Sequence, residues 1–142
     1  MSVLTVYPGS TGADNPVDGA VEKGSANLTL SNIRAAAGDG NIKSSAMGAD
    51  TAYWLALLDS SATYNQYNRL IRGIFCFDTS ALTSAATISA TVLSLYGSGK
   101  VNGLGSPDLH IAASTPAATN ALANDDYNQC QTVSFGSVSY AG

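Results

Sequence analysis

The chain has 142 residues, with ten acidic and six basic side chains, a net charge of -4 and only 11% charged residues. The basic residues are scattered and form no cationic stripe, which disfavours a nucleic-acid-binding role. The scarcity of Lys, Glu and Arg also disfavours a helical bundle, whose exposed faces need such residues. The length suits one domain over residues 1–142.

No apolar run approaches the ~18 residues of a membrane-spanning helix. The longest apolar stretch is 52–58, and the N-terminal sequence Met-Ser-Val-Leu-Thr-Val-Tyr-Pro lacks the basic region of a signal peptide. We therefore expect no membrane span. A location in a virion or outside the cell would be reached by lysis or by another route without a visible signal.

Short segments rich in β-branched and aromatic residues alternate with turns that contain Gly, Asp or Pro. The pattern predicts strands, in chain order, at 3–7, 20–23, 27–33, 69–77, 87–96, 108–112 and 132–140. Residues 53–58 suit either a strand or a helical turn, and 117–123 favour a short helix. Residues 78–82 are expected to turn the chain, because Asp and Ser side chains there can bond nearby backbone N–H groups. The sum indicates an all-β protein, a jelly-roll-like β-sandwich of about eight short antiparallel strands.

The clearest strand is 69–77, because both of its faces are largely apolar and it should therefore lie inside a sheet. We expect Phe75 and Phe77 to share a core with Leu93 and Leu95 of the strand at 87–96.

Two consecutive segments carry a family resemblance. They read Arg-Gly-Ile-Phe-Cys-Phe-Asp-Thr-Ser-Ala-Leu at 72–82 and Ile-Ser-Ala-Thr-Val-Leu-Ser-Leu-Tyr at 88–96. Together with Asp18-Gly19-Ala20-Val21 and Ile33-Arg34, they resemble the core of the DNRLRE-type carbohydrate-binding domains, over about residues 15–115. The sequence also looks like phage and environmental proteins built on this domain. The resemblance implies a jelly-roll sandwich and, in some members, polysaccharide binding.

Members of that family continue through further strands that close the sandwich, so the resemblance implies that a closing strand is missing here. Such a gap would leave an apolar groove with unpaired strand edges. Either a neighbouring subunit fills the groove by strand addition, or the chain comes from a shortened gene or is a smaller variant of the sandwich.

The sequence offers little evidence for a catalytic site. The only histidine, His110, alternates with apolar residues and is expected to be structural or exposed. The single glutamate, Glu22, and the turn-forming aspartates do not suggest the paired carboxylates of a glycosidase. Cys76 and Cys130 match no zinc motif; they suit buried inert thiols or a disulfide. We expect no enzyme activity.

Carbohydrate recognition commonly uses exposed aromatic rings flanked by amides, and one part of the chain concentrates both. The expected binding residues are Tyr53, Trp54, Tyr64, Asn65, Gln66, Tyr67, Asn68 and Arg69. The alternative is that Trp54 is a core residue and that the tyrosines pack at strand edges with solvated hydroxyls. Arg69 and Arg72 could bind an acidic sugar, pair with Asp78, or donate to loop carbonyls.

Calcium is the one cofactor that the sequence suggests, because Ca²⁺ takes carboxylate, amide and carbonyl oxygens. Two loops concentrate such groups, and neither matches an EF-hand. The calcium candidates are Asp14, Asn15, Asp18, Asp125 and Asp126.

The leading functional hypothesis is a non-enzymatic, surface-presenting structural protein. It would belong to a virion or to a self-assembling extracellular structure, would form homo-oligomers, and could contact glycans. The alternative is a free carbohydrate-binding module that recognises a polysaccharide.

Overall fold

The computed structural model describes residues 3–7, 18–24, 26–39, 56–95, 99, 101, 103–105, 108–118 and 120–139. Its elements are β1 (Asp18–Lys23), α1 (Leu30–Ala35), β2 (Ala56–Ser60), β3 (Tyr67–Phe75), β4 (Asp108–Ser114), the 3₁₀ helix η1 (Asn124–Gln129) and β5 (Cys130–Ser139). The described part is therefore mostly β, as the sequence predicts.

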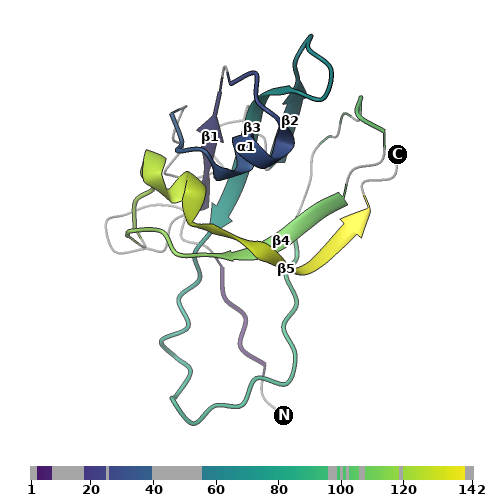
Figure 1. The fold of residues 1–142 in the computed structure, drawn as a ribbon. Coiled ribbons are helices and arrows are strands. Elements are labelled where there is room, and N and C mark those ends of the chain that lie inside the picture. Colours follow the sequence, from purple (N-terminus) through teal and green to yellow (C-terminus); the bar gives the residue numbers. More distant parts are fainter. Residues whose placement is uncertain are drawn as a thin grey trace.

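The strands form two separate antiparallel sheets (Figure 1). The first has three strands in the order β1-β3-β2, and the second is the pair β4-β5. Five strands are thus present among the described residues, and a jelly roll of about eight strands is not confirmed. The strands predicted at 20–23, 69–77, 108–112 and 132–140 correspond to β1, β3, β4 and β5, and 56–58 belongs to β2. β3 begins earlier than predicted, at Tyr67, and ends at Phe75, so 76–77 are not part of it; residue 140 lies outside the described residues.

β3 occupies the centre of the three-stranded sheet because its sequence has apolar residues on both faces. It pairs with β1 on one side, where Val21 lies opposite Arg72, and with β2 on the other, where Leu57 lies opposite Ile71. Ile71 and Ile74 are buried. This strand therefore anchors the sheet, as expected for a central strand.

The hydrophobic core is small and lies between the three-stranded sheet and the segment around η1. Its buried cluster consists of Val21, Ile74, Leu122 and Tyr127, with Leu70, Cys76 and Cys130 packed against it. Residues from β1, β3 and the C-terminal third thus meet in one place. Burying each large apolar side chain stabilises the fold by about 1.5–3 kcal/mol.

The strand predicted at 27–33 is wrong, because helix α1 begins at Leu30. Thr29 is its N-cap, and its hydroxyl accepts a hydrogen bond from the backbone N–H of Asn32 at 3.3 Å. Leu30 and Ile33 are three residues apart, which is helical spacing, and Ile33 is fully buried. Only Leu28 keeps a strand-like contact, an isolated bridge to Tyr67.

Four further expectations about local structure are wrong. Residues 3–7 and 87–95 form no strand. Leu93 and Leu95 are 39% and 43% exposed, so they do not complete a core with Phe75 and Phe77. The residues described within 117–123 are not helical either; the helical turn comes directly after them, as η1. Tyr96 lies outside the described residues.

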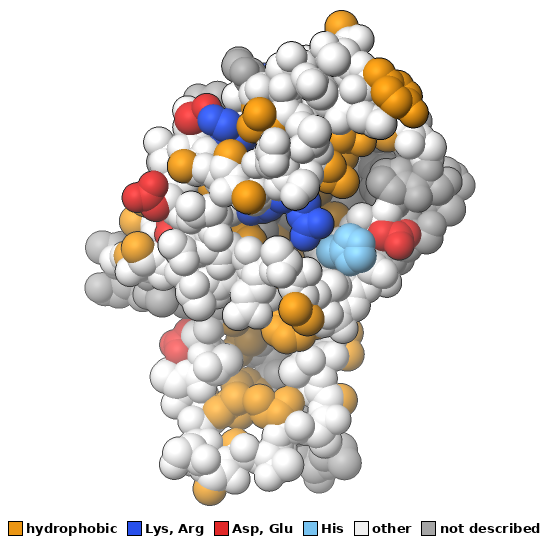
Figure 2. All heavy atoms as spheres, viewed as in Figure 1, with side chains coloured by type: hydrophobic (Ala, Val, Ile, Leu, Met, Phe, Trp, Pro, Cys, Tyr) orange, Lys and Arg blue, Asp and Glu red, His pale blue; other side chains and the backbone are white. Residues whose placement is uncertain are grey.

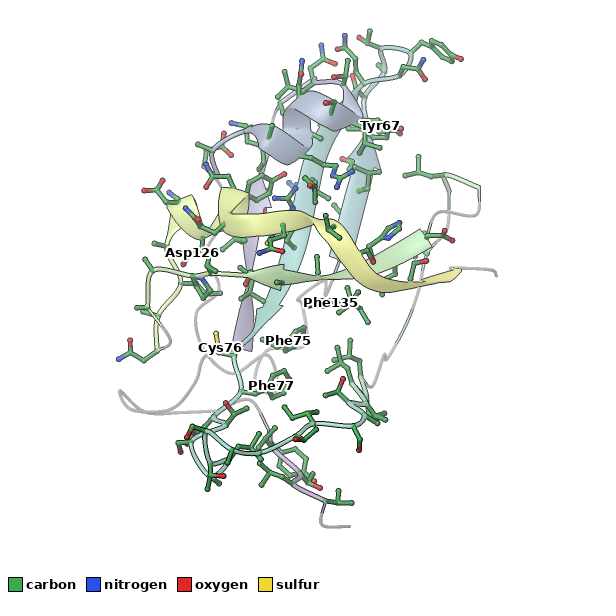
Figure 3. All side chains as sticks on the ribbon, turned by 60° about the horizontal axis from the view of Figure 1, so that its bottom comes forward. Tyr67, Phe75, Cys76, Phe77, Asp126 and Phe135 are labelled. Carbon is green, nitrogen blue, oxygen red and sulfur yellow. The ribbon has the colours of Figure 1, made fainter. Side chains whose placement is uncertain are left out.

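Residues 76–95, which we call the arm, leave the end of β3 and extend away from both sheets, with residues 3–7 running beside them (Figure 1). The arm begins with a turn, as predicted for 78–82: the Ser80 backbone N–H donates to Asp78 Oδ1 at 2.8 Å, and the Leu82 N–H to the Thr79 carbonyl at 2.9 Å. Phe77 lies at the start of the arm (Figure 3). No helix in the described part of the chain has the length and apolarity that crossing a membrane requires.

Candidate functional site

The loop that joins β2 to β3, residues 61–66, carries part of the predicted recognition surface. It is closed by hydrogen bonds from the Ser61 N–H to the Gln66 carbonyl at 2.9 Å and from the Gln66 N–H to the Thr63 carbonyl at 3.1 Å. Asn65 has φ 56°, in the left-handed region that Asn tolerates better than most residues. The loop is therefore a tight turn with its own backbone hydrogen bonds.

Tyr64 projects from this turn and is 89% exposed. Its ring is free to stack on a flat apolar surface, and the exposed amide Asn65 follows directly. The Gln66 side-chain oxygen is buried without a hydrogen-bond partner among the described residues.

The other predicted recognition residues in β3 make contacts with neighbouring parts of the fold. Tyr67 is half-buried opposite Leu28, and Asn68 Nδ2 donates to the Ser60 carbonyl at 3.3 Å. Arg69 pairs with Glu22, with 3.1 Å between Nε and Oε1. The structure therefore brings Tyr64 and Asn65 to one exposed tip and uses their neighbours within the sheet. Tyr53 and Trp54 lie outside the described residues.

Asp126, one of the calcium candidates, is fully buried and binds backbone N–H groups. Its Oδ1 accepts from the Ala117 N–H at 2.8 Å and its Oδ2 from the Ala123 N–H at 2.7 Å. The carboxylate thus fixes the chain that leads into η1, a role that the sequence did not suggest.

The other calcium candidates do not gather around Asp126. Asp125 is exposed, while Asp14, Asn15 and the side chain of Asp18 lie outside the described residues. Within the described ranges, no three His, Cys, Asp or Glu side chains come together in a way that could hold a metal ion.

Arg72 forms a partly buried network that the sequence analysis missed in part. Its guanidinium lies 4.3 Å from the centre of the Tyr127 ring and donates to the Tyr127 carbonyl and, at 2.9 Å, to the Arg34 carbonyl. We expected an arginine to donate to loop carbonyls; Arg72 does donate to carbonyls, but these belong to η1 and α1, and no local pattern identified Tyr127 as a partner. A guanidinium over an aromatic ring is a favourable cation–π contact.

Tyr127 completes this network through its hydroxyl, which donates to the Ile33 carbonyl at 2.6 Å. Burial raises the pKa of the phenol to about 12. The network therefore joins α1, β3 and η1, and its ordered groups all serve internal contacts.

The two cysteines are free thiols in partly buried positions. Burial raises the pKa of both, and at Cys130 the nearby Arg72 partly opposes the shift. Such thiols are poor nucleophiles at neutral pH. This agrees with the expectation of inert thiols, and the structure contains no Cys76–Cys130 bridge. His110 is exposed on β4, as expected.

Large apolar side chains are also exposed in two other places, on the arm and on β5. On the arm, Ile88 is 61% and Val92 89% exposed; on β5, Val133 is 74% and Phe135 79% exposed. Figure 2 shows orange side chains on the lobe formed by the arm and residues 3–7. Monomeric soluble proteins rarely expose large apolar patches, so the arm and β5 are each a candidate for protein–protein contact.

No known protein family matches the chain. A search of curated proteins finds no match, and neither does a search of solved structures.

Proposed function

We propose that the protein is a non-enzymatic structural component that assembles with copies of itself, in a virion or in an extracellular structure. The single observation that carries the proposal is the exposure of large apolar side chains on an extended, unpaired arm. Val92 alone is 89% exposed, and Ile88 is 61% exposed. A neighbouring subunit would remove these side chains from water.

The energetics favour an assembly that buries several of these residues together. Full burial of one Val, Ile or Phe side chain stabilises a contact by about 1.5–3 kcal/mol. Loss of translational and rotational freedom costs an estimated 4–15 kcal/mol, so one residue is insufficient. The arm and β5 together offer enough large apolar side chains to exceed the lower part of that range.

The test is the mass of the purified protein over a range of concentrations, measured by light scattering after size-exclusion chromatography, with electron microscopy of the same samples. We expect oligomers, rings or fibres whose population rises with concentration. A folded monomer at every concentration would overturn the proposal.

The second candidate function is glycan recognition, and it is favoured by Tyr64 and Asn65 at the β2–β3 tip. An exposed ring on a rigid turn can stack on a sugar face without first ordering a flexible loop. In this proposal the tip points outward while the arm mediates assembly, so the two roles are compatible.

Affinity electrophoresis through polysaccharide gels tests this role. We expect Tyr64→Ala to lose any retardation that the wild-type protein shows, because the stacking ring is removed. Tyr7→Ala is the matched control, since Tyr7 is 78% exposed but lies in the N-terminal segment. Equal retardation of both variants and the wild type would remove the tip from any binding site.

A further inference from the structure

We propose that the copies join by strand addition: residues 87–95 of one copy pair with the free edge of β5 in the next copy. This inference rests on the proposed self-assembly and names the two surfaces that would meet. It treats the arm as the donor and β5 as the acceptor.

The donor segment has the properties of a strand without a partner. Residues 87–95 form no strand in the structure and are exposed throughout. They are rich in β-branched residues, and the sequence from 79 to 99 contains neither a charged residue nor a proline. Charges and proline are two of the means, beside bulges and covering loops, by which proteins keep a strand edge from pairing. Their absence leaves this segment competent to pair.

Among the described strands, β5 is the one suited to accept an added strand. Three of the other strands carry charged residues: Glu22 and Lys23 on β1, Asp59 on β2 and Asp108 on β4. The remaining strand, β3, is paired on both sides. β5 carries no charged residue and, among the described residues, pairs only with β4. Within the described part of the chain, the second edge of β5 therefore has no strand partner, although the register between β4 and β5 shifts at two points.

Segment 87–95 and β5 are complementary in their side chains as well as in their free backbone hydrogen-bonding groups. Val133 and Phe135 are 74% and 79% exposed on β5, and an added strand would place its own apolar side chains beside them. A two-stranded sheet is only marginally stable in water, so a third strand would stabilise β4–β5. Figure 3 shows Phe135 on the part of β5 that is turned toward the same side of the molecule as Phe75 and Phe77.

A second copy of this chain is the occupant that these observations favour. In one copy the donor and the acceptor are both exposed, so neither covers the other, and a second copy supplies the complement of each. The chain has a net charge of -4, but neither surface carries charge, so joining them places no like charges together. Because donor and acceptor differ, the contact is head-to-tail and generates rings or open filaments.

The test uses three valine variants that differ only in position. Val92→Asp removes the donor, Val133→Asp removes the acceptor, and Val101→Asp, at a valine that is 76% exposed and outside both surfaces, is the control. All three sites are exposed, so circular dichroism should be unchanged. We expect the first two variants to lose assembly by at least about tenfold in association constant, and the control to assemble like the wild type.

Mixing the two defective variants separates strand addition from other modes. Val133→Asp retains an intact arm and Val92→Asp an intact β5, so the mixture has one competent junction and should form heterodimers that grow no further. Heterodimers in the mixture would also show that both variants are folded. A mixture that stays monomeric overturns the inference.

Two results would overturn the inference and leave the proposed function standing. If the wild type assembles and Val133→Asp assembles equally well, then the arm pairs with something other than β5. If Val92→Asp also assembles normally, then neither surface mediates assembly. A wild type that is monomeric at all concentrations would instead overturn both the inference and the proposed function.

Discussion

Gly38 lies so close to the C-terminal third of the chain that a side chain does not fit there. A Cβ at this position would overlap the Asn124 backbone oxygen and lie 2.8 Å from the Cβ of Tyr127. We expect Gly38→Ala to lower the free energy of unfolding by about 1–3 kcal/mol, because backbone atoms must move apart. Urea unfolding followed by circular dichroism measures the loss.

The control for this substitution is Gly99→Ala, since no atom lies within 4 Å of a Cβ built there. Its free energy of unfolding should stay within about 0.5 kcal/mol of the wild-type value. Equal unfolding midpoints for the two variants would contradict the close approach at Gly38.

Tyr127 should make the protein less stable at alkaline pH. Its pKa is raised from 10.0 to about 12 in the folded state, so the unfolded chain loses the phenolic proton first. The stabilising contribution is therefore complete below pH 10 and is lost as the pH rises toward 12. The thiols of Cys76 and Cys130, whose ordinary value is 9.0, have raised pKa values and act in the same direction from lower pH.

The measurement is the free energy of unfolding between neutral pH and about pH 12 in the wild type and in Tyr127→Phe. The variant should be less stable at neutral pH, because the Ile33 carbonyl loses its donor. The free energy of unfolding of the variant should also lose the part of its pH dependence that falls between pH 10.0, the ordinary pKa of the phenol, and about pH 12, its pKa in the folded protein. An unchanged slope in the variant would contradict the burial of this phenol.

Residue roles were predictable where they depend on neighbours in the sequence. The turn chemistry around Asp78 and the exposure of His110 are examples, and both are confirmed. Arg72 and Tyr127 are 55 residues apart, and no local pattern links them. In the sequence, Asp126 resembles an exposed loop carboxylate, because it follows Asn124 and Asp125. Its burial depends on the packing of the folded chain, which the local sequence does not reveal.

At the scale of elements, Asp126 decides whether the segment leading into η1 keeps its shape. Asp126→Asn replaces one acceptor oxygen with an NH₂ donor that would face a backbone N–H. We expect a loss of about 1–3 kcal/mol in the free energy of unfolding, because a buried donor is left without an acceptor. Thermal and urea unfolding test this.

Asp125→Asn serves as the matched control, since Asp125 is the exposed neighbour on the same turn. It should unfold like the wild type in the presence and absence of calcium. If both variants were equally destabilised, and only when calcium was present, the loop would be acting as a cation site rather than through the hydrogen bonds of Asp126.

Elements were predictable where the apolar pattern was strong and unambiguous. The central strand β3 follows from two apolar faces, and β4 and β5 follow from alternation between turns. The segment 27–33 was misassigned because a cap at Thr29 and helical spacing of Leu30 and Ile33 outweigh β propensity. Residues 87–95 have the composition of a strand, but no described strand pairs with them. Composition indicates that a segment can form a strand and does not indicate whether another strand lies beside it.

For the whole molecule, the absence of charged residues from segment 87–95 and from β5 predicts how assembly responds to salt. Sodium chloride screens repulsion between copies of net charge -4, and sulfate strengthens apolar burial. We expect light scattering to show association that is maintained in sodium chloride and enhanced in ammonium sulfate.

Val92→Asp provides the comparison for this experiment, because it should remain dissociated at the salt concentrations that assemble the wild type. Dissociation of the wild type by added sodium chloride would indicate ion pairs at the contact instead, and would argue against an interface made by these two surfaces.

The network around Tyr127 also bears on how the protein folds as it is synthesised. The Tyr127 hydroxyl reaches the Ile33 carbonyl 94 residues earlier, and the Arg72 contact closes a loop of 55 residues. Until Leu122 and Tyr127 leave the ribosome, the nascent chain lacks two of the four buried side chains that form the core cluster with Val21 and Ile74. Folding of this protein should therefore be a late, high-contact-order event, and the growing polypeptide should be a substrate for holding chaperones until its last quarter emerges.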